Sequence, residues 1–167
     1  ILFTSSFSGG FNVKITYWFL KKVLPIIVSK NPNVVFLFGG FGADRYFSSI
    51  RNKNAVMFSN VDSIKPYLML SDINLNLTYS KAGVKLKLIE ALSYRKKIIS
   101  TTEGVYGSGL SDVVPNTKDP IQFAQYCIDA IEEKINFETA WDKMDELYNA
   151  KRIVQNLNAA LDKILAD

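Results

Sequence analysis

The sequence predicts an α/β fold in which helices cover both faces of one doubly wound parallel sheet. Three observations favour this class. The chain has 167 residues, enough for one domain with a proper core, and 48% of them are hydrophobic. Short apolar runs of strand length also alternate along the chain with segments that have helical periodicity. Strands that alternate with helices along a chain are typical of parallel βαβ units. Charged residues make up 22% of the chain, an ordinary share for a globular domain, which excludes intrinsic disorder.

Six segments have the composition expected of strands. The run at residues 34–38 is continuously apolar, as a strand covered on both faces requires, whereas residues 73–77 alternate between apolar and asparagine side chains. The last candidate, residues 112–114, is short. The expected strands are residues 1–4, 34–38, 55–58, 73–77, 97–101 and 112–114.

Helical periodicity fills the segments between these strands. Residues 12–29 repeat apolar side chains at steps of three and four, with Asn12 as the expected N-cap and Pro25 as the expected bend. The further expected helices are residues 44–50, 63–70, 84–94, 121–135, 137–148 and 151–165. We therefore expect one Rossmann-like domain over residues 1–167, with residues 136–167 as a C-terminal helical extension.

Several function classes are excluded by composition. Histidine is absent and Cys127 is the single cysteine, which excludes disulfide scaffolds, Cys/His zinc sites and triads that need histidine within this chain. We expect Cys127 to be a buried, inert thiol. The aspartates show no metal-ligand spacing, so the sequence predicts neither a metal site nor a cofactor. No apolar run reaches the roughly 18 residues of a membrane span, and a net charge of +4 spread along the chain gives little support for a nucleic-acid partner.

Residues 80–92 are the most informative for function, because ligands of open α/β sheets bind at the carboxyl ends of the strands. Gly83 stands at the expected helix start, with Lys85 and Lys87 in the first turn and Glu90 one turn further on. The free N–H groups and positive dipole end of such a helix favour an anion. We expect this helix to be buried, and two interpretations of Glu90 stay open: it pairs with Lys87, or it binds a ribose hydroxyl.

Residues 83–101 resemble the G-x-[KR]-x-K-x-x-E-A…G-K-P-V-V-x-T stretch of retaining GT-B glycosyltransferases, in family 4 or group 1. Residues 12–25 are similar to the N…W-F-L…V-L-P helix of the same family, and the resemblance covers about residues 1–135. It implies the C-terminal, donor-binding half of a GT-B enzyme, with an N-terminal acceptor domain outside this sequence. The chain opens on Ile1 without an initiator methionine, and we expect a fragment of a longer protein.

The resemblance also implies an activity and a set of site residues. The full-length protein would be a hexosyltransferase of polysaccharide biosynthesis in the cytoplasm, and the isolated domain would be inactive. A nucleoside-diphosphate sugar would be the donor and a glycan or lipid-linked glycan the acceptor, with transfer under retention. Lys85 and Lys87 would be catalytic, through the charge of the leaving diphosphate. The implied donor-binding residues are Gly9, Gly10, Asn60, Val61, Gly83, Val84, Lys85, Leu86, Lys87 and Glu90.

Ala82 departs from the family pattern and keeps other functions open. The family's E-x7-E pattern has a glutamate where this sequence has Ala82. One alternative is a non-catalytic nucleotide-binding α/β module, and another is a sugar-nucleotide epimerase on the same fold, which would normally contribute histidines. The lysine pairs at residues 21–22 and 96–97 are expected to be solvated, with association at the inner face of a membrane as the alternative.

Overall fold

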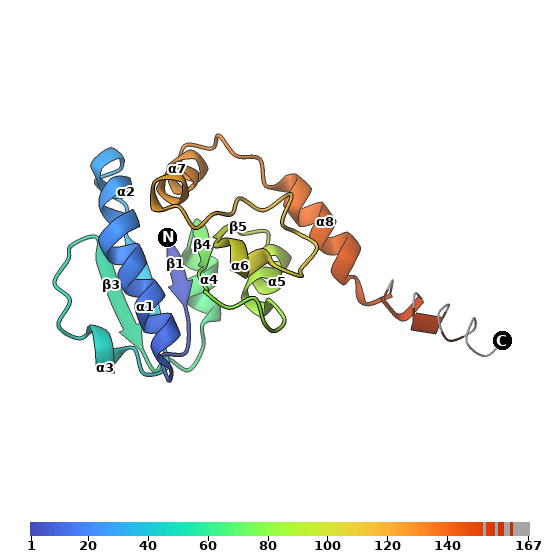
Figure 1. The fold of residues 1–167 in the computed structure, drawn as a ribbon, viewed down its shortest axis with the longest axis horizontal. Helices are drawn as coiled ribbons and strands as arrows, with labels where there is room; N and C mark the ends of the chain where they lie inside the picture. The colour runs from blue at the N-terminus through green and yellow to red at the C-terminus, as the bar shows by residue number, and fades with distance from the viewer. Residues whose placement is uncertain (152, 156, 159–160, 162–167) are drawn as a thin grey trace.

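One parallel sheet forms the centre of the computed structural model (Figure 1). The structure describes residues 1–151, 153–155, 157, 158 and 161. Within them the sheet has five strands in the order β3-β2-β1-β4-β5, all parallel. The strands are β1 (Leu2–Thr4), β2 (Phe36–Gly40), β3 (Ala55–Ser59), β4 (Ile73–Asn76) and β5 (Lys97–Ser100). The doubly wound, Rossmann-like fold predicted from the sequence is confirmed.

The sheet consists of two wings that meet at a seam. We call β3, β2 and β1 the first wing, β4 and β5 the second wing, and the boundary between β1 and β4 the seam. β2 and β3 pair at five positions, and β4 and β5 at four. Across the seam, by contrast, β1 and β4 pair at one position among the described residues, Leu2 with Asn74. The strand order reverses at this point, which makes the seam the topological switch point of the sheet.

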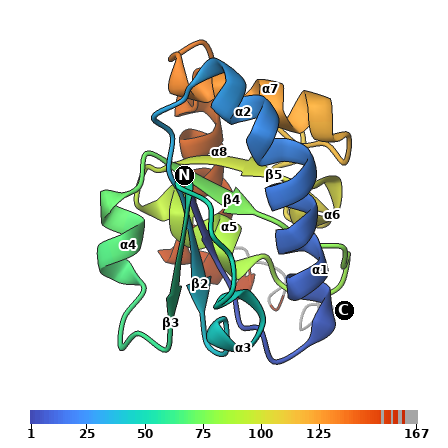
Figure 2. The ribbon, with the colours of Figure 1, turned by 90° about the vertical axis from the view of Figure 1, so that its left-hand side faces the viewer.

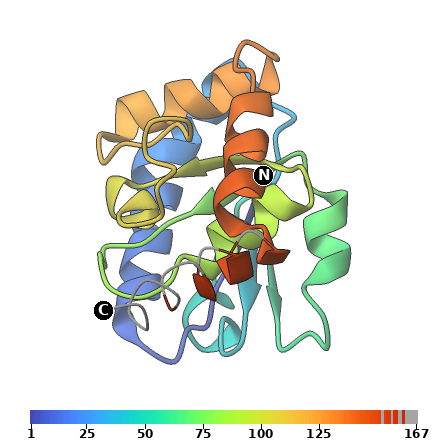
Figure 3. The same ribbon diagram turned by 90° about the vertical axis from the view of Figure 1, so that its right-hand side faces the viewer.

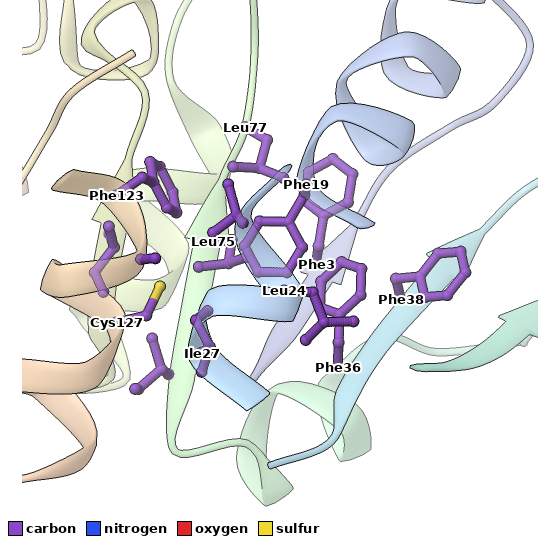
Figure 4. Close-up of a cluster of buried hydrophobic side chains, with 14 of the residues drawn as sticks. Phe3, Phe19, Leu24, Ile27, Phe36, Phe38, Leu75, Leu77, Phe123 and Cys127 are labelled. Atoms are coloured by element: carbon purple, nitrogen blue, oxygen red, sulfur yellow. The ribbon is translucent and has the colours of Figure 1, made fainter. Parts of the chain in front are cut away.

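The helices α1 (Gly10–Trp18), α2 (Leu24–Lys30) and α7 (Pro120–Ile131) cover one face of the sheet (Figure 2). The core beneath them is rich in phenylalanine, and its rings come from both the sheet and the helices (Figure 4). Phe19 packs against Phe36 with ring centroids 4.4 Å apart. Residues drawn from this cluster include Phe3, Phe19, Leu24, Ile27, Phe36, Phe38, Leu75, Leu77, Phe123 and Cys127. This packing fixes the β1–α1 connection at the carboxyl edge of the sheet.

A π-helical turn, η1 (Phe19–Val23), joins α1 to α2. Pro25 lies just beyond it and cannot donate the hydrogen bond that an α-helix requires at that position. Wider π turns absorb such interruptions without ending a helix. A π turn thus precedes Pro25, and helical structure runs without a break from residue 10 to residue 30.

The opposite face carries α4 (Lys65–Leu70), α5 (Leu86–Ser93) and α8 (Glu138–Tyr148). In Figure 3 the orange-red α8 lies in front of the sheet, where it packs on α5. A second core cluster joins these helices to the sheet, with members that include Leu2, Leu68, Leu88, Leu92, Ile98 and Met144. The last expected helix, residues 151–165, lies partly outside the described residues.

Two sequence expectations at the end of the second wing are wrong. Residues 112–114 are not a strand: the N–H groups of Val113 and Val114 both donate to the carbonyl of Leu110 and close a turn. Beyond it, Asn116 makes an isolated bridge to Ser100 of β5. The short helix α6 (Thr102–Val105) was not expected, and its buried Gly104 packs where a Cβ would lie 2.2 Å from the Ser100 hydroxyl.

The two asparagines of β4, which alternate with its apolar residues, are buried. The Asn76 amide donates to the Ser100 hydroxyl at 3.2 Å and to the Gly104 carbonyl at 2.8 Å. Asn74 donates to the Ser71 hydroxyl at 3.1 Å. Buried amides are stable only when they are hydrogen-bonded in this way, so these side chains fix the second wing to α6 and to the end of α4.

Other sequence expectations concern lysines, the cysteine and the membrane. Lys21 and Lys22 are exposed as expected, whereas Lys96 and Lys97 are half-buried: their amines donate to the carbonyls of Met69 and Ala130, at 2.6 and 3.0 Å. Cys127 is buried as expected, and burial raises the pKa of its thiol. In the part of the chain that the structure describes, no helix combines the length and hydropathy needed to cross a bilayer.

Candidate functional site at the switch point

The loop after β1 forms one side of the seam at the carboxyl edge of the sheet. Ser5 is buried and its N–H donates to the carbonyl of Gly39 at 2.9 Å, while Phe7 donates to Phe41 at 2.8 Å. Asn12 is not the N-cap expected from the sequence. Its amide donates to the Ser6 carbonyl at 2.7 Å and holds the loop.

The helix N-terminus on this side belongs to α1. Gly9 is the N-cap residue in extended conformation, and Gly10 begins the helix. Both glycines are exposed, and an added Cβ at either would meet nothing within 4 Å. Their backbone N–H groups therefore lie beside open space at the carboxyl edge, where an anion can approach.

The loop between β4 and α5 forms the other side of the seam. Gly83 has a φ of 78°, a conformation that favours glycine. The Lys85 amine donates to the carbonyls of Ser80 and Ala82, both at 3.0 Å. Lys85 therefore closes this loop on itself, and its charge lies next to the backbone of Ala82, where the family pattern has glutamate.

Lys87 reaches across the seam from the first turn of α5. Its amine donates to the Ser5 hydroxyl at 3.0 Å and lies 5.4 Å from the centre of the Phe3 ring. Burial lowers the pKa of Lys87 to about 8. Among the described residues, no carboxylate forms an ion pair with this amine. A largely buried ammonium without a counter-charge is costly for the folded protein and favours an anionic ligand.

The environment of α5 corrects two expectations. The helix is buried along Leu88, Ala91 and Leu92, whereas Val84 is 73% exposed and Leu86 is 71% exposed. Glu90 is exposed as well, and within the described residues it forms no ion pair with Lys87. Leu86 and Glu90 lie one turn apart on the helix face opposite the buried residues, so the exposed face of α5 includes an apolar side chain.

Asn60 and Val61 follow β3 in the first wing, at the same edge of the sheet as Lys87 but with β2 between β3 and β1. Asn60 has a φ of 51°, and its side-chain oxygen accepts from the N–H of Gly42 at 3.1 Å. Asp44 accepts from the Ser59 hydroxyl at 2.7 Å, and this bond is the main cause of the lowered Asp44 pKa. The Asn60 side chain thus serves the loop geometry.

Sequence reasoning missed Ser5 and Glu103. In the sequence, Ser5 lies in a run of turn-forming residues. The only signal that it belongs to a site is that it is the first residue after the strand. The Glu103 carboxylate is buried and pairs with Lys118. Glu103 also lines a small cavity of about 50 Å³ with Trp18 and Tyr79, and its charge contributes, after burial, to the raised pKa of Tyr79.

A larger cavity lies elsewhere. It has a volume of about 590 Å³ and is lined at the amino-terminal edge of the sheet by residues that include Ile1, Asn31, Val35, Leu70 and Asp72. Ligands of doubly wound sheets bind at the opposite, carboxyl edge. Among the described residues, no group of three or more acidic or cysteine side chains is arranged to hold a metal ion.

Comparisons with known proteins identify a family and a shared fold. A family model described as group 1 glycosyl transferases matches residues 1–136. A Klebsiella pneumoniae protein, described as an uncharacterized 44.6 kDa protein in the cps region, is 25% identical over 175 residues, which cover 94% of this chain and 44% of the relative.

Solved structures share the fold. WaaG, described as a glycosyltransferase involved in lipopolysaccharide biosynthesis, matches with a TM-score of 0.63 and 17% identity over 89% of this chain and 42% of its own. A glycosyltransferase from Rickettsia africae ESF-5 matches with a TM-score of 0.66 and 14% identity over 98% and 47% of the two chains. AviGT4, a glycosyltransferase involved in avilamycin A biosynthesis, matches with a TM-score of 0.57 and 10% identity over 97% and 52%. The chain thus spans about half the length of each relative.

Proposed function

Since the chain belongs to the group 1 glycosyl transferases and has the fold of one half of a GT-B enzyme, we propose that it is the donor-binding half of a retaining sugar transferase. The donor would be a nucleoside-diphosphate sugar. The observation that carries this proposal is Lys87, an ammonium held at the switch point that no carboxylate of the described residues pairs with. A diphosphate supplies the missing negative charge.

The proposed placement of the donor follows from the two sides of the seam. Its diphosphate lies between the N–H groups at Gly9 and Gly10 and the start of α5, within reach of Lys87. Glu90, exposed and free of an ion pair with Lys87, is available for a ribose hydroxyl. The loop of Asn60 and Val61 borders the base.

In the proposed reaction, the bond between the sugar C1 and the diphosphate oxygen breaks, and the diphosphate leaves with the electron pair. The acceptor hydroxyl forms the new bond on the same face of C1 and gives its proton to the released diphosphate. Lys87 stabilises the charge that develops on the leaving group, and Lys85 adds positive charge beside it. Such electrostatic stabilisation is commonly the largest catalytic contribution.

The acceptor is proposed from the relatives. One is described as lying in a cps region and another as acting in lipopolysaccharide biosynthesis, so a glycan or a lipid-linked glycan is the acceptor we propose. It would bind the half of the enzyme that this chain does not contain. The isolated chain would then bind donor without transferring sugar, because transfer requires both substrates to be held together.

The test is a calorimetric titration of this chain with UDP, GDP and ADP, compared with the Lys87→Met and Lys53→Met variants. Lys53 is an exposed lysine of the β2–β3 connection, at the opposite end of β3 from Asn60, and serves as the matched control. Saturable binding that is lost in Lys87→Met and kept in Lys53→Met supports the donor site. In the full-length enzyme, Lys87→Met should lower turnover by about a hundred- to a thousandfold. Absence of binding by a well-folded chain contradicts the proposal.

A further inference from the structure

The contact between Lys87 and Ser5 joins two segments that are 82 residues apart in the chain. Lys87 belongs to the second wing, because α5 follows β4, whereas Ser5 directly follows β1 of the first wing. Among the described residues, the Ser5 hydroxyl is the one hydrogen-bond partner of this amine. An ammonium has three N–H donors, so two remain for a ligand at the seam.

Ser5 itself is held rigidly. It is 7% exposed, and its N–H donates to the Gly39 carbonyl at 2.9 Å. Its carbonyl lies against Gly40, where an added Cβ would come within 2.1 Å of the oxygen. Gly40 has a φ of 136°, which glycine adopts readily. The Ser5 hydroxyl is therefore presented to the amine from a fixed backbone.

We propose that Ser5 is a positioning residue that accepts one hydrogen bond from Lys87 and thereby directs the other two N–H groups of the amine toward the donor diphosphate. This inference rests on the proposed function. Without the hydroxyl, the face of the Phe3 ring is the contact that remains for the amine within the described residues, and a ring face does not fix N–H directions. The long lysine side chain is then free to turn toward solvent.

The consequence for ligand binding is a loss of affinity without a loss of fold. Ser5→Ala removes one oxygen atom from a buried position and leaves the charge of Lys87 in place. We expect the affinity for a nucleoside diphosphate to fall about tenfold, the effect of a charge-assisted hydrogen bond that orients a ligand contact. Ser5→Thr retains the hydroxyl and should restore most of this affinity.

The experiment combines NMR of 15N-labelled lysine with calorimetry on wild-type chain, Ser5→Ala, Ser5→Thr and Ser108→Ala. Ser108 is the matched control, a buried serine whose hydroxyl donates to the Val105 carbonyl at 2.7 Å. Lys87→Arg assigns the Nζ resonance of Lys87. The inference is supported when Ser5→Ala shifts that resonance and weakens binding of UDP, GDP or ADP, whichever binds the wild type, while Ser108→Ala does neither.

Two results overturn the inference separately from the proposed function. An unchanged Lys87 resonance in Ser5→Ala shows that the contact is absent in solution, and an unchanged affinity shows that the contact does not orient the amine. If none of the three nucleotides binds the wild type, the proposed function fails. Inorganic pyrophosphate then replaces them as the probe in the same comparison, and equal or absent pyrophosphate binding in wild type and Ser5→Ala overturns the inference.

Discussion

At the scale of single residues, Lys87 combines a structural cost with a functional use. Its amine is withdrawn from water beside Phe3, and in the described part of the chain it has a neutral hydroxyl as its hydrogen-bond partner. A buried charge without a partner lowers the stability of a fold. Sites that bind charged ligands often carry such costs, because the ligand supplies the compensation.

The first prediction concerns stability. Lys87→Met keeps the length of the side chain and removes the charge, so at pH 7 the free energy of unfolding should rise by about 2 kcal/mol, as measured by urea denaturation. The folded pKa of about 8 lies below the ordinary lysine pKa of 10.5, so the cost is fully present below pH 8 and disappears as the pH rises toward 10.5. The difference between variant and wild type should shrink over that interval. Equal stability at pH 7 contradicts the prediction.

The second prediction concerns the pH dependence of ligand binding. A neutral Lys87 cannot pair with a diphosphate, and its pKa in the free chain is about 8. The affinity for a nucleoside diphosphate should therefore fall about tenfold between pH 7 and pH 9 in calorimetry. Lys87→Arg keeps its charge over this interval, and its affinity should be nearly constant. A wild-type affinity that is flat with pH would show that another group carries the charge.

The sequence predicts single residues of the site better than it predicts contacts between segments that lie far apart in the chain. Lys87 could be selected because a lysine in the first turn of a helix after a strand suits an anion. The contact of Lys87 with Ser5 could not be predicted, because no local sequence pattern connects two residues that are 82 positions apart. The exposure of Glu90, by contrast, agrees with the period of α5, because Glu90 lies on the helix face opposite the buried Leu88 and Leu92.

At the scale of elements, two glycines of β2 allow the close backbone contacts that fix the position of Ser5. An added Cβ at Gly39 would lie 1.9 Å from the carbonyl oxygen of Phe58 in β3. Gly40 faces the Ser5 carbonyl on the other side. The sequence suggested a turn at these glycines, because the apolar run ends before them. They belong to the strand instead, where the neighbouring backbones approach too closely for a side chain.

The third prediction tests this approach. Gly40→Ala combines a φ of 136° with a contact of 2.1 Å to backbone, so it should destabilise the chain by about 3 kcal/mol or more. Gly10→Ala is the matched control, since an added Cβ there meets nothing within 4 Å in the first turn of α1. The control should be neutral or stabilising by up to about 1 kcal/mol. Thermal denaturation measures both, and a tolerated Gly40→Ala would contradict the account.

The expected strands at residues 1–4, 34–38, 55–58, 73–77 and 97–101 all exist, with boundaries shifted by up to two residues. Strong apolar runs between turn signals made them visible. The sixth expected strand failed because a run of three apolar or acidic residues also fits a turn, and local hydrogen bonds to the Leu110 carbonyl close that turn. The short helix α6 lacks periodicity altogether and follows from the buried contacts of Gly104.

At the scale of the whole molecule, Trp141 joins the two faces of the sheet. It packs against both core clusters, and its indole N–H donates to the Lys96 carbonyl at 3.2 Å. The chain passes from α7 to α8 around the edge strand β5, so this side chain closes that edge. The docking of α8 therefore depends on one aromatic residue more than on its exposed charged side.

The fourth prediction separates the packing of Trp141 from its hydrogen bond. Trp141→Phe retains an aromatic ring and loses the N–H, and should cost about 1 kcal/mol. Trp141→Ala loses the ring as well and should cost about 3 kcal/mol or more. Urea denaturation followed by far-UV circular dichroism compares the two. Equal losses in both variants would contradict a packing role for the ring.

The seam has a consequence for the cooperativity of unfolding. The first wing is built from residues 1–59 and the second from residues 73–100, so each contains mainly sequence neighbours, whereas Leu2 and Asn74 are the register pair between them. Local opening of a fold follows boundaries of this kind. A ligand that contacts Lys87 on one wing and Gly9 on the other opposes such opening. The hydrogen exchange of the backbone amides of Leu2 and Asn74 should therefore slow when a nucleoside diphosphate binds. Donor binding would then act as a cross-link that makes two semi-independent folding units open as one.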